Sequence, residues 1–420
     1  MRIGIINIGD ELLSGKILNS NQFDLARVLA PLGHDIPFNL VIGDDAAGIA
    51  CALDWASGPQ ALIKADLLIL TGGLGPTRDD LTRQAVAGFL KRPVVASAEA
   101  MAWLGEFLGK PAGEVPEEQS VQAGVPEGTR ALRNPAGTAC GFAFSAAGIP
   151  AYAFPGVPAE LEAMMRLHLL PGLKGDGILL ERAAWTWGWS ESAQRRAFAS
   201  LDFPGHFRFS SLPGEKGVRL TLSCLCVPSQ QADRASELDL LWRNMLALIP
   251  PESIVDAEGA TLPQAVVKLL SAKGATVSVA ESCTGGGLGF LLTEVPGSSN
   301  VFRQGFLTYS DAAKSEWLGV PGKTLEAAGA VSEATALAMA RGCLEKSRAD
   351  YAVSITGIAG PTGGTPEKPV GTVWIAVASK DSAIARLFKM RGDRNTIRWR
   401  SAYSALNQLR LLISGQLGLK

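Results

Sequence analysis

The chain has 420 residues, of which 47% are hydrophobic, and its 39 Lys and Arg residues nearly balance its 40 Asp and Glu residues. Because a single hydrophobic core stops growing at about 250 to 300 residues, this length predicts two or three domains. A net charge of -1 excludes a global field that would recruit nucleic acid or an anionic membrane, so partners must be selected by local sites.

The cysteines and the apolar segments bear on the cellular compartment. Six cysteines are scattered without a C-x-x-C pair, and only three histidines occur, so the spacing of a zinc site is absent. Reduced, buried thiols are expected, as in a cytoplasmic protein. Asp10 and Glu11 interrupt the first apolar run, which predicts a strand rather than a signal peptide, and no run of about 18 uncharged apolar residues occurs. We expect a soluble, cytoplasmic protein with no membrane partner.

Residues 1–170 alternate short apolar runs with amphipathic stretches. The runs RIGIINI, DLLIL and AYAFP predict buried strands, whereas NQFDLARVLAPLG and DDLTRQAVAGFLK predict helices. Strands that alternate with helices are typical of βαβ units around a parallel sheet. The pattern therefore predicts an α/β domain.

A glycine-rich loop follows the second of these strands, in LLILTGGLGPTRDD. Backbone amides can be presented to a phosphate by Thr71, Gly72, Gly73 and Gly75. The carboxylates of Asp79 and Asp80 can hold a divalent cation that bridges this phosphate, or they only cap the helix that begins beside them. The loop lacks G-K-S/T and is therefore not a P-loop.

The opening segment NIGDELLSGKILNSN has the same form, a strand followed by carboxylates and a helix. Asp10 and Glu11 follow the strand, and we expect the helix to be capped near Ser20. These two carboxylates are further candidate metal ligands.

Residues 171–250 have a different pattern of predicted strands and helices. HFRFSSLPGEKGVRLTLSCLCV predicts an antiparallel hairpin with its turn at Pro213 and Gly214, and ADRASELDLLWRNMLALI predicts a helix. Cys224 and Cys226 alternate with apolar residues, which favours packing over chemistry. The segment reads as a small α+β module, and a prolyl pair at its end marks a boundary with the third domain.

Residues 251–420 return to the α/β pattern. The helix LPQAVVKLLSAKG, the strand TVSVA and a glycine-rich loop come first, followed by the strands FRQGFLTYS, DYAVSITGIAG and VGTVWIAVAS. An amphipathic stretch from Asn395 to Leu412 predicts a C-terminal helix.

The loop VAESCTGGG places Ser282, Cys283 and Thr284 side by side after a predicted strand. All three histidines precede this domain, so neither a Ser-His-Asp nor a Cys-His arrangement can form within it. A catalytic thiolate usually needs a neighbouring cation that lowers its pKa, which weakens the case for Cys283. Ser282 with a lysine base is the known alternative. The loop amides, with Thr284, Gly285 and Gly286, can form an oxyanion hole or anion site, unless Ser and Thr only cap the helix.

A well-placed lysine occurs in LTYSDAAKSEWLGV. Ser310 is a predicted N-cap, which places Lys314 in the first turn of a helix, where burial and the helix dipole favour the neutral amine of a base. We expect Asp311 to face solvent, because an inward carboxylate would oppose this effect. Tyr309 is positioned to relay or orient a proton.

Two further loops are candidates for anion binding. SITGIAGPTGG follows a strand, which places Thr356 and Gly357 where open α/β sheets bind ligands. In MRGDRNTIRWR, Asp393 is a predicted N-cap, and Arg394 beside it suits a phosphate, although arginines on helices are commonly solvated.

The motifs AESCTGG, TYSDAAK, YAVSITGIAGP, KPVGTVWIAVA and GDR resemble the CinA C-terminal domain family, the bacterial nicotinamide mononucleotide deamidases. The resemblance implies a Ser/Lys amidohydrolase with Ser282 as nucleophile, Lys314 as base and Tyr309 as the assisting hydroxyl. The implied reaction converts nicotinamide mononucleotide to nicotinic acid mononucleotide and ammonia through an acyl-enzyme, without a cofactor. Arg394 and the glycine-rich loops would hold the phosphate or the oxyanion.

In residues 1–170, NIGDELLSGKILNSN, LTGGLGPTRDD, NPAGTACGF and FPGVPAELEAM resemble the molybdopterin-binding fold of MoaB and MogA type proteins, in the version found at the N-terminus of full-length CinA. The resemblance implies a divalent-metal-dependent ADP-ribose pyrophosphatase, with Asp79, Asp80 and Glu11 as candidate metal ligands. The middle module, with GWSES and GVRLTL, resembles the central KH-like domain of CinA, and the family implies a homodimer.

The leading hypothesis is therefore a bifunctional pyridine-nucleotide salvage hydrolase of multidomain α/β fold. One alternative is a regulatory protein, linked to competence or DNA damage, that binds a nucleotide or molybdopterin-type ligand without catalysis. Another is a decayed deamidase site, against which the intact Ser282, Tyr309 and Lys314 argue. We do not expect a nucleic-acid partner, because no G-x-x-G loop is predicted between helices of the middle module and the net charge is near zero.

Overall fold

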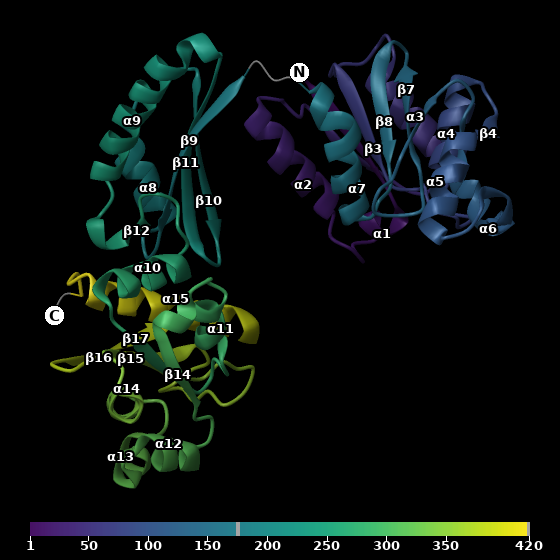
Figure 1. Cartoon of the computed structure of the whole chain (residues 1–420). Helices are drawn as coiled ribbons and strands as arrows, with labels where there is room; N and C mark the ends of the chain where they lie inside the picture. The colour runs from purple at the N-terminus through teal and green to yellow at the C-terminus, as the bar shows by residue number, and fades with distance from the viewer. Residues whose placement is uncertain (174–176, 418–420) are drawn as a thin grey trace. The chain divides into compact units, whose positions relative to one another are not determined.

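The structure is a computed structural model that describes residues 1–173 and 177–417. The chain divides into two compact units, Met1–Leu180 with Leu225–Arg234 and Glu181–Cys224 with Ala235–Lys420 (Figure 1). The predicted α/β class is confirmed, whereas the boundaries after residues 170 and 250 stay predictions. Among the described residues, none of the helices has the length and apolar character needed to cross a membrane.

The first unit contains a six-stranded sheet. In sheet order its strands are β2 (Asn39–Ile42), β1 (Ile3–Ile8), β3 (Leu67–Thr71), β8 (Ile149–Phe154), β7 (Gly141–Ala146) and β6 (Arg130–Leu132). The first four are parallel, but β7 and β6 are antiparallel to their neighbours, so the prediction of a parallel sheet is correct only in part. The reason is a two-residue turn at Ala147 and Gly148, both with positive φ, which is too short for a crossover helix.

Helices cover both faces of this sheet (Figure 1). One face packs against α2 (Ser20–Leu29) and α7 (Pro158–Met164), and the other against α3 (Ala46–Ser57), α4 (Thr82–Leu90) and α5 (Ala98–Leu108). Ile3 and Ile5 of β1 belong to the first core, and Ile6 and Ile8 belong to the second. Smaller elements are α1 (Asp10–Leu13), α6 (Glu117–Ser120) and the paired strands β4 (Val94–Ala96) and β5 (Gly124–Pro126).

A four-stranded sheet follows in the middle of the chain. Its strands in order are β10 (Phe207–Gly214), β11 (Gly217–Cys226), β9 (Ile178–Thr186) and β12 (Ile254–Asp256), with helices α8 (Glu191–Phe198) and α9 (Gln231–Ala247) beside it (Figure 1). The predicted hairpin forms, but its turn lies at Glu215 and Lys216, because Pro213 still pairs with Val218. Proline is tolerated there because β10 is an edge strand.

The last sheet has five strands. In order they are β14 (Phe302–Leu307), β13 (Val277–Glu281), β15 (Tyr351–Gly357), β16 (Thr372–Ser379) and β17 (Ala383–Lys389). The first three are parallel and the last two antiparallel, so this sheet is mixed as well. No helix lies in the connection from β15 to β16, which is consistent with their antiparallel pairing.

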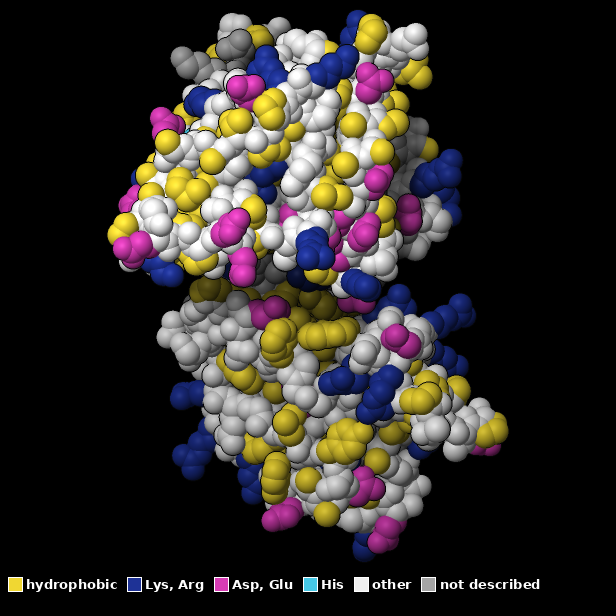
Figure 2. All heavy atoms as spheres, turned by 90° about the vertical axis from the view of Figure 1, so that its right-hand side faces the viewer, with side chains coloured by type: hydrophobic (Ala, Val, Ile, Leu, Met, Phe, Trp, Pro, Cys, Tyr) yellow, Lys and Arg dark blue, Asp and Glu magenta, His cyan; other side chains and the backbone are white. Residues whose placement is uncertain are grey.

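Helices again cover both faces of this sheet. On one face lie α10 (Leu262–Lys273), α11 (Gly287–Thr293) and α15 (Arg394–Ile413), and on the other α12 (Asp311–Leu318), α13 (Gly322–Ala328) and α14 (Glu333–Ser347). The predicted C-terminal helix is confirmed as α15, and Asp393 is its N-cap, accepting from the amide of Thr396 at 2.8 Å. On the face shown in Figure 2, basic and acidic side chains are interspersed, as the near-zero net charge leads one to expect.

Candidate functional site

Three loops meet at the carboxyl ends of the parallel strands β13, β14 and β15. They enclose a cavity of about 220 Å³, and the start of α15 contributes to its wall. The cavity is lined by predicted site residues from all four segments: Ser282, Tyr309, Lys314, Thr356, Gly357 and Arg394. The parallel pairing therefore brings together side chains that lie up to 112 positions apart in the sequence, from position 282 to position 394.

Lys314 is only 1% exposed, in the first turn of α12. Its N-cap is Ser310, as predicted, because the Ser310 hydroxyl accepts from the amide of Ala313 at 3.2 Å. Lys314 Nζ donates to the carbonyl of Tyr309 and to Oδ1 of Asp311, each at 3.2 Å. The Asp311 side chain is 60% exposed, as expected, yet its Oδ1 also reaches Lys314 Nζ, because positions three apart share one helix face and a buried amine requires acceptors.

Ser282 and Lys314 line the same cavity. Within the described part of the chain, no hydrogen bond joins Lys314 Nζ to Ser282 Oγ. Catalytic hydrogen bonds are often long in the absence of substrate and tighten once it is bound. The arrangement is consistent with a Ser282 hydroxyl that Lys314 activates once substrate is bound.

Glu281, which sequence reasoning missed, holds the loop after β13 in place. Its side chain is 1% exposed. Oε2 accepts from the amides of Gly286 and Leu288, both at 3.0 Å, and Oε1 accepts from that of Gly289 at 2.8 Å. A glutamate placed just before a glycine-rich helix start was the available signal, because carboxylates stabilise helix N-termini.

The backbone amides of this loop therefore differ in whether they are free to bind a ligand. Gly286 donates to Glu281, and Gly285 donates to the carbonyl of Ser282 at 3.1 Å. Of the three predicted residues, Gly285 and Gly286 therefore use their amides within the loop, whereas Thr284 does not. Among the residues that the structure describes, the amides of Cys283 and Thr284 have no acceptor, and of these two residues Cys283 lines the cavity, so its amide is the candidate for an oxyanion hole.

Burial separates the three candidate nucleophiles. Cys283 is 6% exposed, and burial raises the pKa of its thiol to about 12, so the thiolate is not formed near neutral pH. Thr284 is 1% exposed and is not among the residues that line the cavity, although its backbone carbonyl accepts from Arg398 at 2.8 Å. Ser282 lines the cavity and is therefore the candidate nucleophile among the three.

Arg394 ties the start of α15 to two loops of the cavity. Nη1 donates to the carbonyl of Gly360 at 2.6 Å, and Nη2 donates to the phenol oxygen of Tyr309 at 3.4 Å. Thr356, another predicted ligand residue, instead donates its hydroxyl to the carbonyl of Ala330 at 2.7 Å. Arg394 therefore orients Tyr309, and Thr356 stabilises the cavity wall through its hydrogen bond to Ala330.

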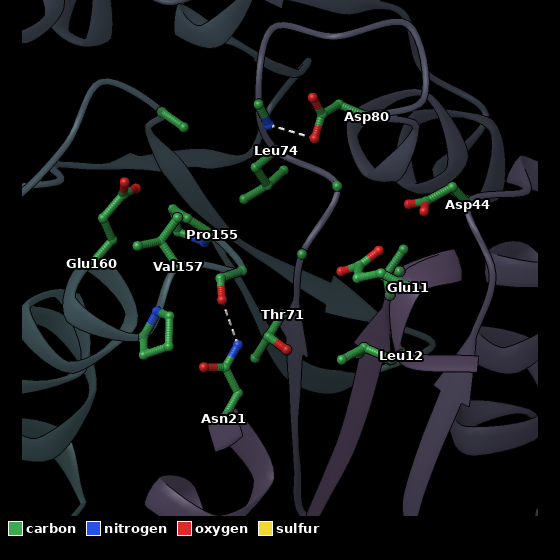
Figure 3. Close-up of a pocket in the computed structure, with 18 of the residues that line it drawn as sticks. Glu11, Leu12, Asn21, Asp44, Thr71, Leu74, Asp80, Pro155, Val157 and Glu160 are labelled. Carbon is green, nitrogen blue, oxygen red and sulfur yellow. Dashed lines mark hydrogen bonds between the residues drawn. The ribbon is translucent and has the colours of Figure 1, made fainter. Parts of the chain in front are cut away.

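A larger cavity, of about 540 Å³, lies in the first unit at the carboxyl ends of β1, β3 and β8 (Figure 3). Of the eight residues predicted for the N-terminal site, all except Asp10 line it: Glu11, Thr71, Gly72, Gly73, Gly75, Asp79 and Asp80. The parallel strands thus assemble this site in the same way as the C-terminal one.

Asp80 holds the glycine-rich loop of this cavity. Oδ1 accepts from the amide of Gly75 and Oδ2 from that of Thr77, both at 2.8 Å (Figure 3). The helix α4 begins only at Thr82, and its N-cap Leu81 offers no side-chain acceptor, so Asp80 closes the loop rather than capping the helix. Gly72, at φ 101°, donates to the carbonyl of Phe154 at 3.0 Å.

The same loop retains two open amides. Gly73 and Leu74 have no backbone or side-chain acceptor in the described ranges. A Cβ at Gly72 would lie 2.1 Å from the carbonyl oxygen of Ile8, so the loop passes too close to β1 for any other residue. The open amides make this loop a candidate phosphate-binding site. Gly73 would contribute its amide, whereas Gly72 is required because the loop passes close to β1.

Carboxylates gather on one side of the cavity, and one of them, Asp44, was not predicted. The amide of Asp10 donates to Asp44 Oδ2 at 2.8 Å, and the amide of Asp44 donates to Asp10 Oδ1 at 3.2 Å. Burial raises the pKa of Asp44, and the negative charges of Glu11, Asp10 and Asp79 raise it further. The pair of aspartates that follows β2 after a single glycine, in VIGDD, was the sequence signal.

A divalent cation fits these residues only together with a phosphate. Across the described residues, no three His, Cys, Asp or Glu side chains form a ready-made metal cluster. Mg²⁺, however, is usually bound through one or two carboxylates plus substrate phosphates. Glu11 and Asp44, with Asp79 nearby, suit that mode, whereas the carboxylate of Asp80 is already bound to its own loop.

Two α/β regions, each with a cavity at the carboxyl ends of parallel strands, define a molybdopterin-binding-like domain followed by a second α/β domain with a serine and a lysine in its cavity. Residues 4–175 match the family described as probable molybdopterin binding domain, and residues 259–413 match the CinA C-terminal domain. A CinA-like protein of Geotalea daltonii is 36% identical over 98% of both chains, and one of Chlorobaculum tepidum is 40% identical over 97% of this chain and 98% of its own. The chain belongs to the CinA family, which confirms the resemblance found in the sequence.

A solved structure matches part of this chain. The crystal structure of competence/damage inducible protein CihA from Agrobacterium tumefaciens is 42% identical, with a TM-score of 0.36, and the match covers 36% of this chain and 93% of that chain.

Proposed function

We propose that this chain is a bifunctional hydrolase of pyridine nucleotides, whose C-terminal cavity deamidates nicotinamide mononucleotide. The observation that supports this is the convergence of Ser282, Tyr309 and Lys314 on one cavity that contains no histidine. The thiol of Cys283 is buried and the Thr356 hydroxyl donates to the carbonyl of Ala330, which favours Ser282 as the nucleophile. The class of reaction is acyl transfer with a serine nucleophile and a lysine base.

The proposed mechanism gives each group a step. Ser282 Oγ would attack the carboxamide carbon while Lys314 Nζ takes its proton, and the amide of Cys283 would stabilise the oxyanion. The proton returns to the leaving nitrogen, ammonia departs, and water attacks the acyl-enzyme to release nicotinic acid mononucleotide. Arg394 carries the positive charge suited to the phosphate of the substrate.

The N-terminal cavity is proposed to hydrolyse ADP-ribose at its pyrophosphate. The open amides of Gly73 and Leu74 would bind one phosphate, and Glu11 and Asp44 would hold a divalent cation beside it. Such a cation neutralises charge on the phosphates when it is bound. The volume of about 540 Å³ lies within the range typical of sites for ligands of this size.

The two activities are separable in one experiment on the full chain. Ammonia release from nicotinamide mononucleotide and phosphate-bond cleavage in ADP-ribose are measured with and without a chelator, for the parent and for Ser282→Ala. We expect Ser282→Ala to abolish only ammonia release and the chelator to abolish only ADP-ribose hydrolysis. Cys283→Ala is the matched control and should retain ammonia release.

Other outcomes favour other readings of the family. Ammonia release that survives Ser282→Ala but not Cys283→Ala would move the nucleophile to the thiol. No hydrolysis of either substrate by the parent would favour the alternative in which both cavities bind nucleotide-like ligands without catalysis.

A further inference from the structure

Thr82, the first residue of α4, binds two carbonyls of the glycine-rich loop that follows β3. Its hydroxyl donates to the carbonyl of Gly72 at 2.8 Å, and its amide donates to the carbonyl of Gly73 at 3.1 Å. Thr82 is fully buried and is not among the residues that line the cavity of the first unit, whereas both glycines line it. The two carbonyls therefore point toward α4, on the side of the loop away from the cavity.

The planarity of the peptide bond converts these two contacts into an orientation of amides. In a trans peptide group the C=O and the N–H point in opposite directions. The carbonyl of Gly72 shares a peptide group with the amide of Gly73, and the carbonyl of Gly73 shares one with the amide of Leu74. These are the two amides of the loop that have no acceptor among the described residues. Thr82 thus directs both open amides away from α4, toward the cavity that Gly73 and Leu74 line.

The first of these peptide groups lies between two glycines, so its orientation depends on the hydroxyl of Thr82. Gly72 and Gly73 have φ angles of 101° and 64°, and glycine adopts either sign of φ with little penalty. Among the described residues, the bond from Thr82 Oγ1 is the only hydrogen bond that this peptide group makes. Without the hydroxyl, the group can turn and present its carbonyl oxygen, in place of its amide, to the cavity.

The rest of the loop is held by other side chains. Arg83, which is 3% exposed, donates from Nη1 to the carbonyl of Gly75 at 3.2 Å and from Nη2 to the carbonyl of Leu74. Asp80 accepts from the amide of Gly75. Loss of the Thr82 hydroxyl should therefore release one peptide group and leave the remainder of the loop in place.

The charges that line the cavity make the orientation of these amides important. Among its described lining residues none is Lys, Arg or His, and five carry carboxylates: Glu11, Asp44, Asp79, Asp80 and Glu160. A phosphate in this cavity therefore depends on backbone amides and on a bound cation rather than on basic side chains. A carbonyl oxygen turned toward the phosphate would add to the repulsion from the carboxylates.

We propose that Thr82 is a positioning residue for phosphate binding, because its hydroxyl keeps the amide of Gly73 directed into the cavity. The inference rests on the ADP-ribose hydrolysis proposed above. The amide would contact the phosphate before and during hydrolysis alike. Loss of its orientation should therefore weaken binding of substrate and transition state equally, which raises KM and leaves kcat nearly unchanged.

Thr82→Val tests the hydroxyl alone, because valine has a similar shape and retains the backbone amide. We expect KM for ADP-ribose to rise about 10-fold while kcat changes less than about 2-fold. Affinity for inorganic pyrophosphate, measured by titration calorimetry on the full chain with Mg²⁺, should fall about 10-fold. Thr82→Ser restores the hydroxyl and should restore both quantities. Thr82→Ala replaces the valine variant, with the same expectation, if the latter does not fold.

Thr335→Val is the matched control. Thr335 of α14 is also fully buried, and its hydroxyl also donates to a glycine carbonyl, that of Gly329, at 2.8 Å. Thermal unfolding should show a similar loss of stability in Thr335→Val and Thr82→Val, because each removes one buried hydrogen bond. Only Thr82→Val should change KM for ADP-ribose and affinity for pyrophosphate. Equal effects of the two variants on these quantities would mean that Thr82 has a structural role alone.

The outcomes separate this proposal from the hydrolase function. A parent chain that hydrolyses ADP-ribose, with a KM that Thr82→Val leaves unchanged or Thr82→Ser does not restore, would overturn the role of Thr82 and leave the hydrolase intact. A parent chain that binds pyrophosphate without hydrolysing ADP-ribose, and loses affinity only in Thr82→Val, would support the role of Thr82 and refute the hydrolase. A parent chain that does not bind pyrophosphate would overturn the phosphate site and the role of Thr82 with it.

Discussion

The glycine-rich loops after β3 and after β13 are built in the same way. In each, the first residue past the strand donates its amide to the neighbouring strand: Gly72 to Phe154 of β8 at 3.0 Å, and Ser282 to Ile355 of β15 at 3.0 Å. The next two amides have no acceptor among the described residues, and a carboxylate then binds the amides beyond them. The two loops thus share one arrangement, in which two amides without an acceptor lie between amides that are hydrogen-bonded.

The loops differ in the residue at the first position and in the carboxylate that holds them. Gly72 has no side chain, so its loop can bind a ligand but cannot react with it. Ser282 adds a hydroxyl at the corresponding place. Asp80 follows its loop and is partly exposed, whereas Glu281 precedes its loop and is 1% exposed. The comparison teaches that both loops offer open backbone amides, and that one side chain, Ser282, separates a loop proposed only to bind from one proposed to react.

Removing the proposed base, Lys314, should have the largest effect, and it should lower only the activity of the C-terminal cavity. Lys314→Met keeps the buried volume but removes the amine, so we expect kcat for ammonia release to fall about 10²-fold to 10⁴-fold. ADP-ribose hydrolysis should be unchanged. Steady-state kinetics for both substrates, with a thermal unfolding control, check this prediction. An unchanged kcat for ammonia release would contradict the role of Lys314.

Changing the carboxylate of the buried loop should have the next largest effect. Glu281→Gln leaves one amide hydrogen facing a donor, which should lower the free energy of unfolding by about 1 to 3 kcal/mol. The displaced loop should also lower kcat for ammonia release more than it raises KM. Glu294→Gln, at the exposed far end of α11, is the matched control and should change neither quantity. Denaturant unfolding and steady-state kinetics of the two variants test both expectations.

The equivalent change at the partly exposed loop should be milder. Asp80→Asn still accepts from Gly75 but places a donor against the amide of Thr77, which we expect to destabilise the loop by about 1 kcal/mol. The KM for ADP-ribose should rise a few-fold while ammonia release stays unchanged. If both activities fell together, the two loops would not be independent and the comparison would fail.

The smallest effect concerns the buried thiol beside Ser282. Burial raises the pKa of Cys283 from 9.0 to about 12, so between these values the unfolded chain loses the proton and the native chain keeps it. The contribution to stability is therefore complete below pH 9 and declines as the pH rises toward 12. Cys283→Ala should remove this part of the pH dependence. Unfolding by denaturant at pH 8 and pH 10, for parent and variant, tests the sign.

The sequence predicted the α/β class and many of the residues that line both cavities, because strand and helix periodicities and glycine-rich loops are local signals. It did not predict the antiparallel strands β7, β6, β16 and β17, since strand direction depends on whether a connection returns across the sheet. The turn of the hairpin was misplaced by two residues for a similar reason: strand register, rather than the proline, determined it.

The sequence by itself determined which chemistry is available: a serine, a lysine and a tyrosine without histidine in the last domain, and carboxylates beside glycine loops in the first. Only the tertiary structure decided which groups are free to act. It showed that Glu281 and Asp80 already hold loop amides, that Asp311 turns toward Lys314, and that Asp44 joins the acidic side of the larger cavity. The physical reason is that hydrogen bonds and burial depend on which elements pack together, and spacing along the chain does not specify that.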